Sequence, residues 1–145
     1  MTHLYTRGTE YGLLALQVML GDTERVWRVG DICSLSSTPE QFTRKVLHGL
    51  AKAGILASTR GPQGGYSFAR APEEITLFEV VTAIEVKPRF DLCILGFAVC
   101  SEKKPCALHH LWSPIKASAL AMLKGRTIAD LAGVPMSKKD RDDSE

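Results

Sequence analysis

The chain has 145 residues, 45% hydrophobic and 23% charged, with a formal net charge of +2. This size supports one compact domain with an appended helix or arm. The longest apolar run, residues 13–20, ends before the charged segment at Asp22, well short of the roughly 20 residues that cross a bilayer. The first residues lack a signal-peptide layout. We therefore expect a cytoplasmic protein with no membrane partner, whose clustered cysteines stay reduced and favour metal binding over disulfides.

Two helices are predicted at the start of the chain. Residues 11–20 are apolar on nearly every face, which indicates a helix buried between other elements. Residues 27–35 carry apolar side chains at helical spacing and predict a short second helix. Cys33 lies on its apolar face, so we interpret it as a buried core cysteine rather than a ligand.

A third helix is predicted over residues 39–53. Thr38 is expected as its N-cap, with Gln41 completing a capping box, and Gly54 is expected to end it. Phe42, Val46 and Leu50 are predicted to form its buried stripe. The opposite stripe is polar and basic, and consists of Gln41, Arg44, Lys45 and His48. A short helix, a tight turn and a second helix with such a face indicate a helix-turn-helix that enters the DNA major groove.

A β-hairpin is predicted directly after this helix. Residues 55–59 and 66–69 are strand-like, and the glycine-rich turn 60–65 joins them. The hairpin, about 55–70, is interpreted as a wing whose Arg60 reaches the minor groove. Residues 39–70 contain five basic residues and one acidic residue, which favours a polyanionic partner.

The second half of the chain is predicted as helix, loop and helix. Thr76 and Glu79 form a capping box that opens a helix expected to pack on the first one. Residues 93–105 lack periodicity and predict a loop. An apolar seam from Leu108 to Leu123 then predicts a long helix that stops at Gly125. We interpret it as a dimer interface, and the alternative is that it folds back on its own core.

The predicted loop is rich in metal-ligand residue types. Cys93, Cys100 and Cys106 have the spacing C-x6-C-x5-C, and His109 follows three positions later. Soft thiolates with a nearby imidazole suit an iron–sulfur cluster or zinc.

These motifs together resemble the Rrf2 family of bacterial transcription regulators. The resemblance is carried by residues 59–66 (TRGPQGGY), residues 72–76 (PEEIT) and the cysteine loop, and it runs from about residue 4 to 131. It implies a mainly α fold with a small β wing: a winged helix-turn-helix domain plus a long C-terminal dimerisation helix. In the iron–sulfur-binding branch of the family, the state of the cluster controls DNA binding.

The resemblance also implies a ligand set. The cluster ligands would be Cys93, Cys100 and Cys106. The fourth ligand would be His109, which we prefer because imidazole is an established partner of thiolates, or Glu10 of the partner subunit. A 2Fe-2S cluster is favoured over 4Fe-4S. The first gap between cysteines is six residues, where five is common in the family, and its filling is unusually apolar.

The sequence thus predicts a homodimer that binds a palindromic DNA operator and senses iron, redox state or nitric oxide. The alternatives are a metal-free thiol switch, with Lys103 and Lys104 near the thiols, and a structural zinc protein. The chain carries no phosphate-binding loop and no nucleophile–base pair, so no enzyme and no small organic substrate are inferred. The expected DNA contacts are Thr38, Glu40, Gln41, Arg44, Lys45, His48, Lys52, Arg60, Gly61, Gln63 and Gly64.

The expected organisation has four parts. Residues 1–87 form the winged helix-turn-helix domain and residues 88–107 the sensor loop. Residues 108–134 form the dimerisation helix and a short terminal helix, and residues 135–145 a disordered tail.

Overall fold

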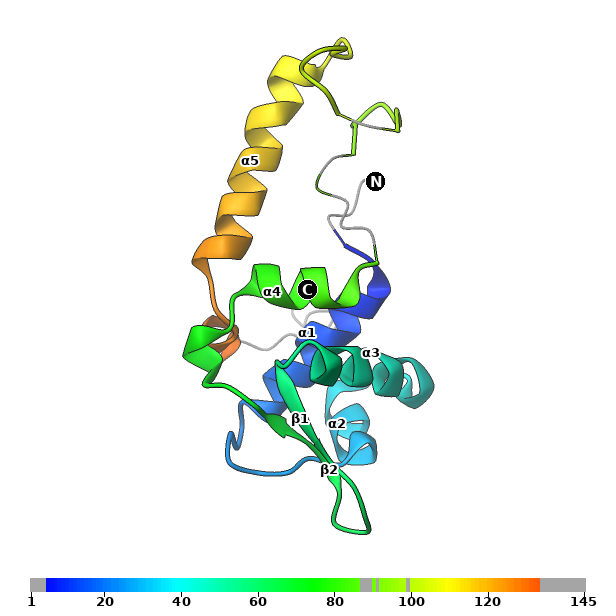
Figure 1. Cartoon of the computed structure of the whole chain (residues 1–145), viewed down its shortest axis with the longest axis vertical. Coiled ribbons are helices and arrows are strands. Elements are labelled where there is room, and N and C mark those ends of the chain that lie inside the picture. The colour runs from blue at the N-terminus through cyan, green and yellow to red at the C-terminus, as the bar shows by residue number, and fades with distance from the viewer. Residues whose placement is uncertain (1–4, 87–89, 91, 99, 134–145) are drawn as a thin grey trace, which may run out of the picture.

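The computed structural model describes residues 5–86, 90, 92–98 and 100–133, and the predicted tail 135–145 lies outside them. The described chain is mainly helical with a two-stranded wing, which confirms the predicted fold (Figure 1). The elements in chain order are α1 (Arg7–Met19), α2 (Val29–Ser36), α3 (Glu40–Lys52), β1 (Leu56–Thr59), β2 (Gly65–Phe68), the 3₁₀ helix η1 (Pro72–Glu74), α4 (Leu77–Ile84), α5 (His109–Gly125) and the 3₁₀ helix η3 (Ile128–Leu131).

Helix α1 is the centre of the core. It packs against α2, α3, α4 and η3, and Leu16 and Met19 on it are fully buried. At Gly12 an added Cβ would lie 3.0 Å from Val46 and would collide with Ile84, so the missing side chain brings α1 close to α3 and α4. The predicted buried first helix is confirmed, although it begins four residues earlier than expected, at Arg7.

The buried stripe of α3 differs from the prediction by one position. Its buried residues are Thr43, Leu47 and Leu50, whereas Phe42 is 61% exposed. The prediction was therefore wrong at Phe42. Gly54 follows the helix with a φ of 78°, the left-handed conformation expected of the glycine that ends a helix.

The wing is an antiparallel hairpin with Leu56 opposite Phe68 and Thr59 opposite Gly65. Leu56 is buried in the core while the other residues of β1 are exposed. The base of the hairpin is therefore anchored, and its tip projects away from the helices (Figure 1).

Helix α4 begins with the predicted capping box. The backbone N–H of Glu79 donates to Thr76 Oγ1 at 3.1 Å, and the backbone N–H of Thr76 donates to Glu79 Oε2 at 2.9 Å. After α5 the chain returns to the start of α4, where the backbone N–H of Ile128 donates to the carbonyl oxygen of Ile75 at 2.9 Å. Ile128 is fully buried there.

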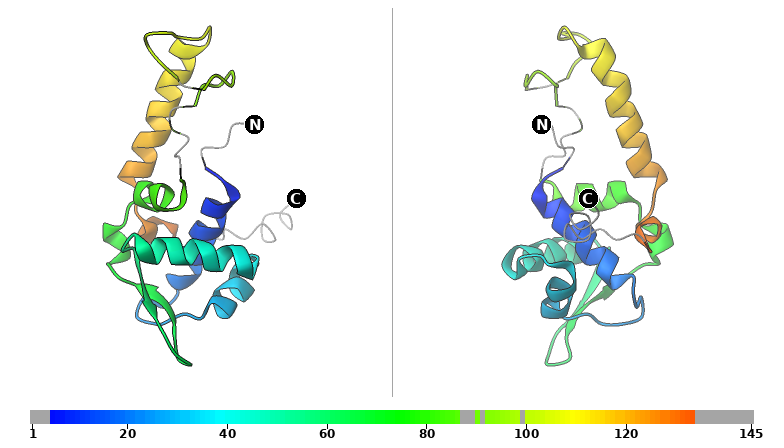
Figure 2. Two further views of the ribbon diagram at one scale, coloured as in Figure 1. Left: turned by 45° about the vertical axis from the view of Figure 1, so that its right-hand side comes forward. Right: turned by 180° about the vertical axis from the view of Figure 1, so that it is seen from behind.

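Helix α5 stands away from the winged-helix body in each view (Figure 2). Its last turns pack on α4, where Leu123 is 2% exposed, and its first turn carries the cysteine loop at the far end of the molecule. None of the helices in the described residues is long and apolar enough to cross a membrane.

Candidate nucleic-acid interface and cysteine-rich site

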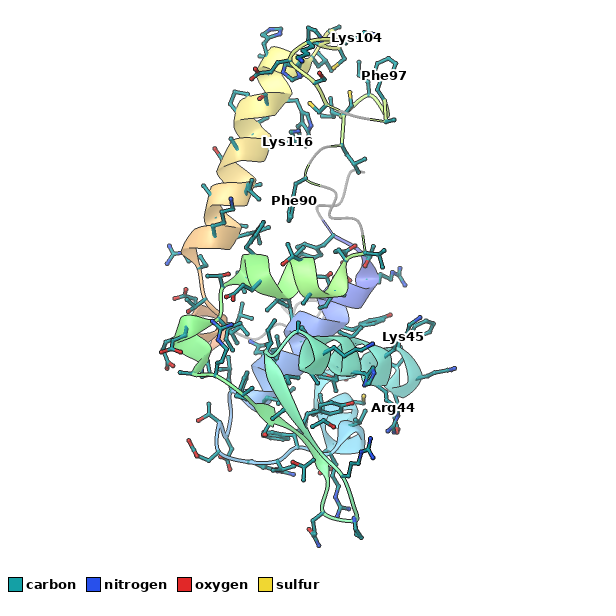
Figure 3. All side chains as sticks on the ribbon, viewed as in Figure 1. Arg44, Lys45, Phe90, Phe97, Lys104 and Lys116 are labelled. Atoms are coloured by element: carbon teal, nitrogen blue, oxygen red, sulfur yellow. The ribbon has the colours of Figure 1, made fainter. Side chains whose placement is uncertain are left out.

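The outer face of α3 is polar and basic, as predicted. Gln41, Arg44, Lys45 and His48 are all exposed, and Figure 3 shows Arg44 and Lys45 on this helix. Arg44 Nη2 pairs with Glu40 Oε1 at 2.7 Å. Exposed ion pairs of this kind contribute little, so the guanidinium can exchange its carboxylate for a base or a phosphate. This face has the donors and acceptors that base edges in a major groove can pair with.

The start of α3 is built differently from the prediction. Pro39 occupies the N-cap position and no side chain caps the helix, so the capping box expected at Thr38 is wrong. Thr38 is 8% exposed, and its Oγ1 accepts a hydrogen bond from Thr43 Oγ1 at 2.9 Å and lies 2.8 Å from Ser36 Oγ. The hydroxyl of Thr38 therefore fixes the turn between α2 and α3 from the inside.

The tip of the wing requires its glycines. Arg60, Gly61 and Gln63 are exposed and Gly64 is half-buried. Gly61 has a φ of 102°, and a Cβ on Gly64 would collide with the carbonyl oxygen of Thr59. Side chains at these two positions would be strained, so the narrow tip depends on glycine.

Residues just before α2 hold the wing in place. Trp27 and Tyr66 exchange two backbone hydrogen bonds of 2.7 and 2.8 Å, and a Cβ on Gly65 would collide with the Trp27 carbonyl. Arg28 Nη2 donates to the carbonyl oxygen of Pro62 at 2.8 Å. Sequence reasoning missed Arg28, because a contact between residues 34 positions apart leaves no local pattern.

Several cations of this face are free to meet phosphates. Lys45, Lys52 and Arg60 have no acidic partner within the part of the chain that the structure describes. The ion pairs found there are Arg25–Asp31, Arg44–Glu40 and Arg70–Glu79. A row of unpaired cations along α3 and the wing is the electrostatic footprint expected of a nucleic-acid interface.

In the cysteine loop, the Cys93 thiol is 5% exposed. Burial raises the pKa of this thiol by desolvation, but hydrogen bonds to its sulfur outweigh that effect and leave the pKa lowered. The partners are the backbone N–H groups of Leu95, Phe97 and Gly96 and the side chain of Cys106. Such donors stabilise a thiolate, which is the form of cysteine that binds metals and reacts with oxidants.

The other two predicted ligands form a second pair. Cys100 Sγ lies 3.2 Å from Nδ1 of His109, the first residue of α5. The loop is also tied to the helix, because Trp112 Nε1 donates to the carbonyl oxygen of Leu92 at 3.0 Å. Both pairs belong to the loop that leads into α5, and this loop lies at the end of the molecule far from the wing (Figure 1). Within the described residues, no group of three or more His, Cys, Asp or Glu side chains is arranged to hold a metal ion.

The remaining candidates lie elsewhere. Glu10 is half-buried in the first turn of α1, and His110 is exposed beside His109. Cys33 is 8% exposed within the core of the winged helix, as predicted.

One side of α5 is an exposed apolar stripe. Leu111, Ile115 and Met122 are 60%, 57% and 52% exposed. Their spacing places them on one face of the helix. They belong to the predicted apolar seam, and they have no cover within the described part of the chain.

A helix-turn-helix with a basic outer helix and an adjacent wing defines a DNA-binding transcription regulator. The sequence model of the Rrf2 family, described as "Iron-dependent Transcriptional regulator", matches residues 5–133, and the chain belongs to this family. It is a transcription regulator and not an enzyme.

Its relatives agree with this assignment. A putative HTH-type transcriptional regulator of Aquifex aeolicus is 32% identical over 133 residues, which cover 90% of this chain and 92% of the relative. The crystal structure of CymR, the global cysteine regulator of B. subtilis, has a TM-score of 0.70 at 23% identity, and the match covers 90% of this chain and 96% of CymR. The structure of T. potens IscR has a TM-score of 0.68 at 23% identity, with 97% and 89% covered. At this identity the two structures establish the shared fold.

Proposed function

We propose that the chain is a homodimeric transcription regulator whose affinity for a palindromic operator is controlled by an iron–sulfur cluster. The proposed ligands are Cys93, Cys100 and Cys106, with His109 as the fourth. Glu10 of the partner subunit is the alternative fourth ligand.

The observation that carries the proposal is the contact of 3.2 Å between Cys100 Sγ and His109 Nδ1, which brings a thiol and an imidazole together in the cysteine loop. The lowered pKa of the buried Cys93 thiol in the same loop supports it, because the thiolate is the form that binds a cluster. Three thiolates and one imidazole fit the ligand chemistry of an iron–sulfur cluster, and mixed cysteine and histidine ligation favours 2Fe-2S. A bound cluster would supply a centre that responds to redox state, iron supply or nitric oxide.

The chain's own contacts explain how the loop can influence the DNA-binding elements. Trp112 ties the loop to α5 through Leu92, and the last turns of α5 pack on α4 around the buried Leu123. Helix α4 in turn packs on α1 and α3. A shift of the loop would therefore bias the angle of α5 against the body and select between two states of the dimer.

The homodimer is supported by α5. Its exposed apolar stripe of Leu111, Ile115 and Met122 is unusual on a surface, and a second copy with the same stripe would cover it about a two-fold axis. Two winged helices related in this way would read two half-sites separated by about one helical turn or a multiple of it.

The test begins with protein purified without oxygen. Absorption and Mössbauer spectra are recorded, and DNA binding is followed in the same samples before and after nitric oxide or oxidant. The DNA is a duplex recovered by in vitro selection from a random pool. We expect Cys100→Ala to abolish the visible absorbance, whereas the matched control Cys33→Ala retains it because Cys33 lies in the core. An unchanged spectrum of Cys100→Ala would contradict the ligand assignment.

The fourth ligand is tested in the same way. His109→Ala should shift the cluster spectrum or destabilise the cluster, and Glu10→Ala should leave it unchanged. The opposite pattern would assign the position to Glu10 of the partner subunit.

A metal-free thiol switch is the second candidate, because the side chains of Cys93 and Cys106 are hydrogen bonded. Peroxide would oxidise the two thiols to one disulfide, with two electrons passing to the peroxide and two molecules of water formed. The protein would then be colourless, and its DNA affinity would respond to peroxide. Zinc bound by the same residues would appear in elemental analysis without visible colour.

A further inference from the structure

A polar hollow of about 350 Å³ lies between the start of α2, the helix α3 and the wing. Arg28, Val29 and Gly30 form one wall, and Arg44 on α3 faces it. The third wall is the hairpin, from Ser58 and Thr59 through Gly61 to Gly64, Gly65 and Tyr66. Three separate elements of the proposed DNA-binding face therefore converge on one space.

The chemistry of the lining is that of an anion site. The lining residues include two arginines, three residues with a hydroxyl group and four glycines, and none of the lining residues is acidic. Arg28 uses Nη2 to bind the Pro62 carbonyl, which leaves its other N–H donors available. Arg44 is paired with Glu40 in an exposed ion pair, which a phosphate can replace.

The position of the hollow selects the kind of anion. If α3 enters a major groove and the wing enters the adjacent minor groove, the sugar–phosphate strand between the two grooves must pass between α3 and the wing. The hollow occupies this place. The space beside Gly30 and Gly61 is open, since a Cβ added at either position would meet nothing within 4 Å. A backbone phosphate can therefore approach closely at both positions.

We propose that this hollow, with Arg28 as its principal cation, binds one phosphate of the DNA strand that separates the two grooves. The proposal rests on the proposed DNA-binding function and adds a specific site to it. Arg28 contacts both the phosphate and the wing, so it also sets the wing relative to the DNA strand. Arg44 shares the phosphate from the side of α3.

The test compares Arg28→Ala with the matched control Arg126→Ala. Arg126 is an exposed arginine beyond α5 and does not line the hollow, so both variants lose one positive charge. Binding to a selected duplex and to a random-sequence duplex is measured from about 50 to about 300 mM salt, over which the Debye length falls from about 14 to about 6 Å. We expect Arg28→Ala to weaken both complexes about three- to tenfold and to reduce the slope of log K against log salt by about one. Arg126→Ala should leave the slope unchanged.

Methylphosphonate substitution locates the phosphate. Duplexes in which single phosphates are replaced by neutral methylphosphonates are bound to wild-type protein and to Arg28→Ala. At one position per half-site, the substitution should weaken wild-type binding and have no further effect on Arg28→Ala. Full additivity at every position, or an unchanged salt slope, would overturn the proposal and leave Arg28 as a support of the wing alone.

Two controls keep the outcomes separate. Thermal unfolding checks that Arg28→Ala is folded, and Arg28→Lys tests whether a cation without the guanidinium fork restores the slope but not the full affinity. If wild-type protein binds neither duplex, the DNA-binding function itself fails. If it binds but shows no coupling to Arg28, only the phosphate site fails.

Discussion

The winged-helix body (residues 5–86) and the projecting arm, which consists of the cysteine loop and α5, differ in how many of their apolar side chains are buried. Of the 18 buried apolar residues among those described, only Cys93, Leu123 and Ile128 come after residue 86. Of the 11 large apolar side chains that are exposed, seven come after residue 90. These seven are Ile94, Leu95, Phe97, Leu108, Leu111, Ile115 and Met122.

We infer from this contrast that the body is held mainly by its own contacts, whereas the arm leaves apolar surface available for association. Apolar surface on this scale is costly to leave in water, and it marks sites of association. We infer that the stability of the body and the association of the arm can be changed independently. The predictions below test this separation, from the largest expected effect to the smallest.

Truncating a buried core side chain should strongly destabilise the winged-helix body. Leu47 on α3 is fully buried, and we expect Leu47→Ala to lower the free energy of unfolding by about 2–5 kcal/mol. Denaturant unfolding measures this value. The matched control is Leu35→Ala, since Leu35 is 63% exposed and its truncation should cost below about 0.5 kcal/mol. Equal losses at the two positions would refute the assignment of the core.

A charge introduced into the apolar stripe of α5 should weaken the proposed dimer without unfolding the protein. Ile115 is 57% exposed in the middle of α5, and we expect Ile115→Glu to weaken the proposed dimer at least about a hundredfold by burying a charge at its interface. Sedimentation measures the dissociation constant, and circular dichroism should show unchanged helix content. Ala117→Glu, at an exposed position on the opposite side of the same helix, adds the same single negative charge and serves as the charge control. A monomeric wild-type protein would remove the basis of this prediction.

The boundary between body and arm is held by a buried carboxylate. Glu85 is 8% exposed at the end of α4, and its Oε1 accepts hydrogen bonds from the Thr6 N–H, the Thr6 hydroxyl and the Thr9 hydroxyl at 2.6–2.8 Å. Its negative charge also lies at the N-terminus of α1, where it is favourable. We expect Glu85→Ala to cost about 1–3 kcal/mol, because buried donors lose their acceptor.

This prediction is checked by denaturant unfolding beside Thr82→Ala, an exposed position on the same helix. In Glu85→Ala, amide hydrogen exchange should become faster at the first turn of α1. Exchange that becomes faster evenly over the whole body would mean that Glu85 does not act at this boundary.

The sequence predicts the elements of both regions because their signals are local. The capping box of Thr76 and Glu79 forms as expected, since its partners are three residues apart. The hairpin also forms as expected, because its tight tip requires glycine at Gly61 and Gly64 and the sequence has glycine at both positions.

Tertiary contacts account for the predictions that were wrong and for the contacts that the sequence does not predict. The hydroxyl of Thr38 turns inward because Thr43 offers a buried partner, and this contact replaces the local cap. The contacts of Glu85 with Thr6 and Thr9 join residues 76–79 positions apart, and that of Arg28 with Pro62 joins residues 34 apart. No periodicity encodes such pairs. The cysteine spacing predicts ligand types, but it does not predict the pairing of Cys93 with Cys106.

The smallest predicted effect concerns the helix on which the arm rests. The pKa of Glu79 is lowered by the backbone N–H of Thr76 and by the Arg70 guanidinium, with burial opposing them. A carboxyl whose pKa is lower in the folded state contributes stability above its unfolded pKa, about 4.3, and loses it as the pH falls through the folded value. Since the Glu79 side chain is 38% exposed, solvent screening should keep the contribution below about 1 kcal/mol.

Glu79→Gln should therefore destabilise the protein slightly at pH 7, and the difference from wild type should shrink at about pH 3. Unfolding curves at the two pH values measure it, with Glu73→Gln, exposed in η1 outside the capping box, as the control. Because Glu79 caps α4 and α5 packs on α4, the variant should also loosen the base of the arm without exposing the core around Leu16. Hydrogen exchange that rises in α1 as much as in α4 would show that body and arm are not separable at this joint.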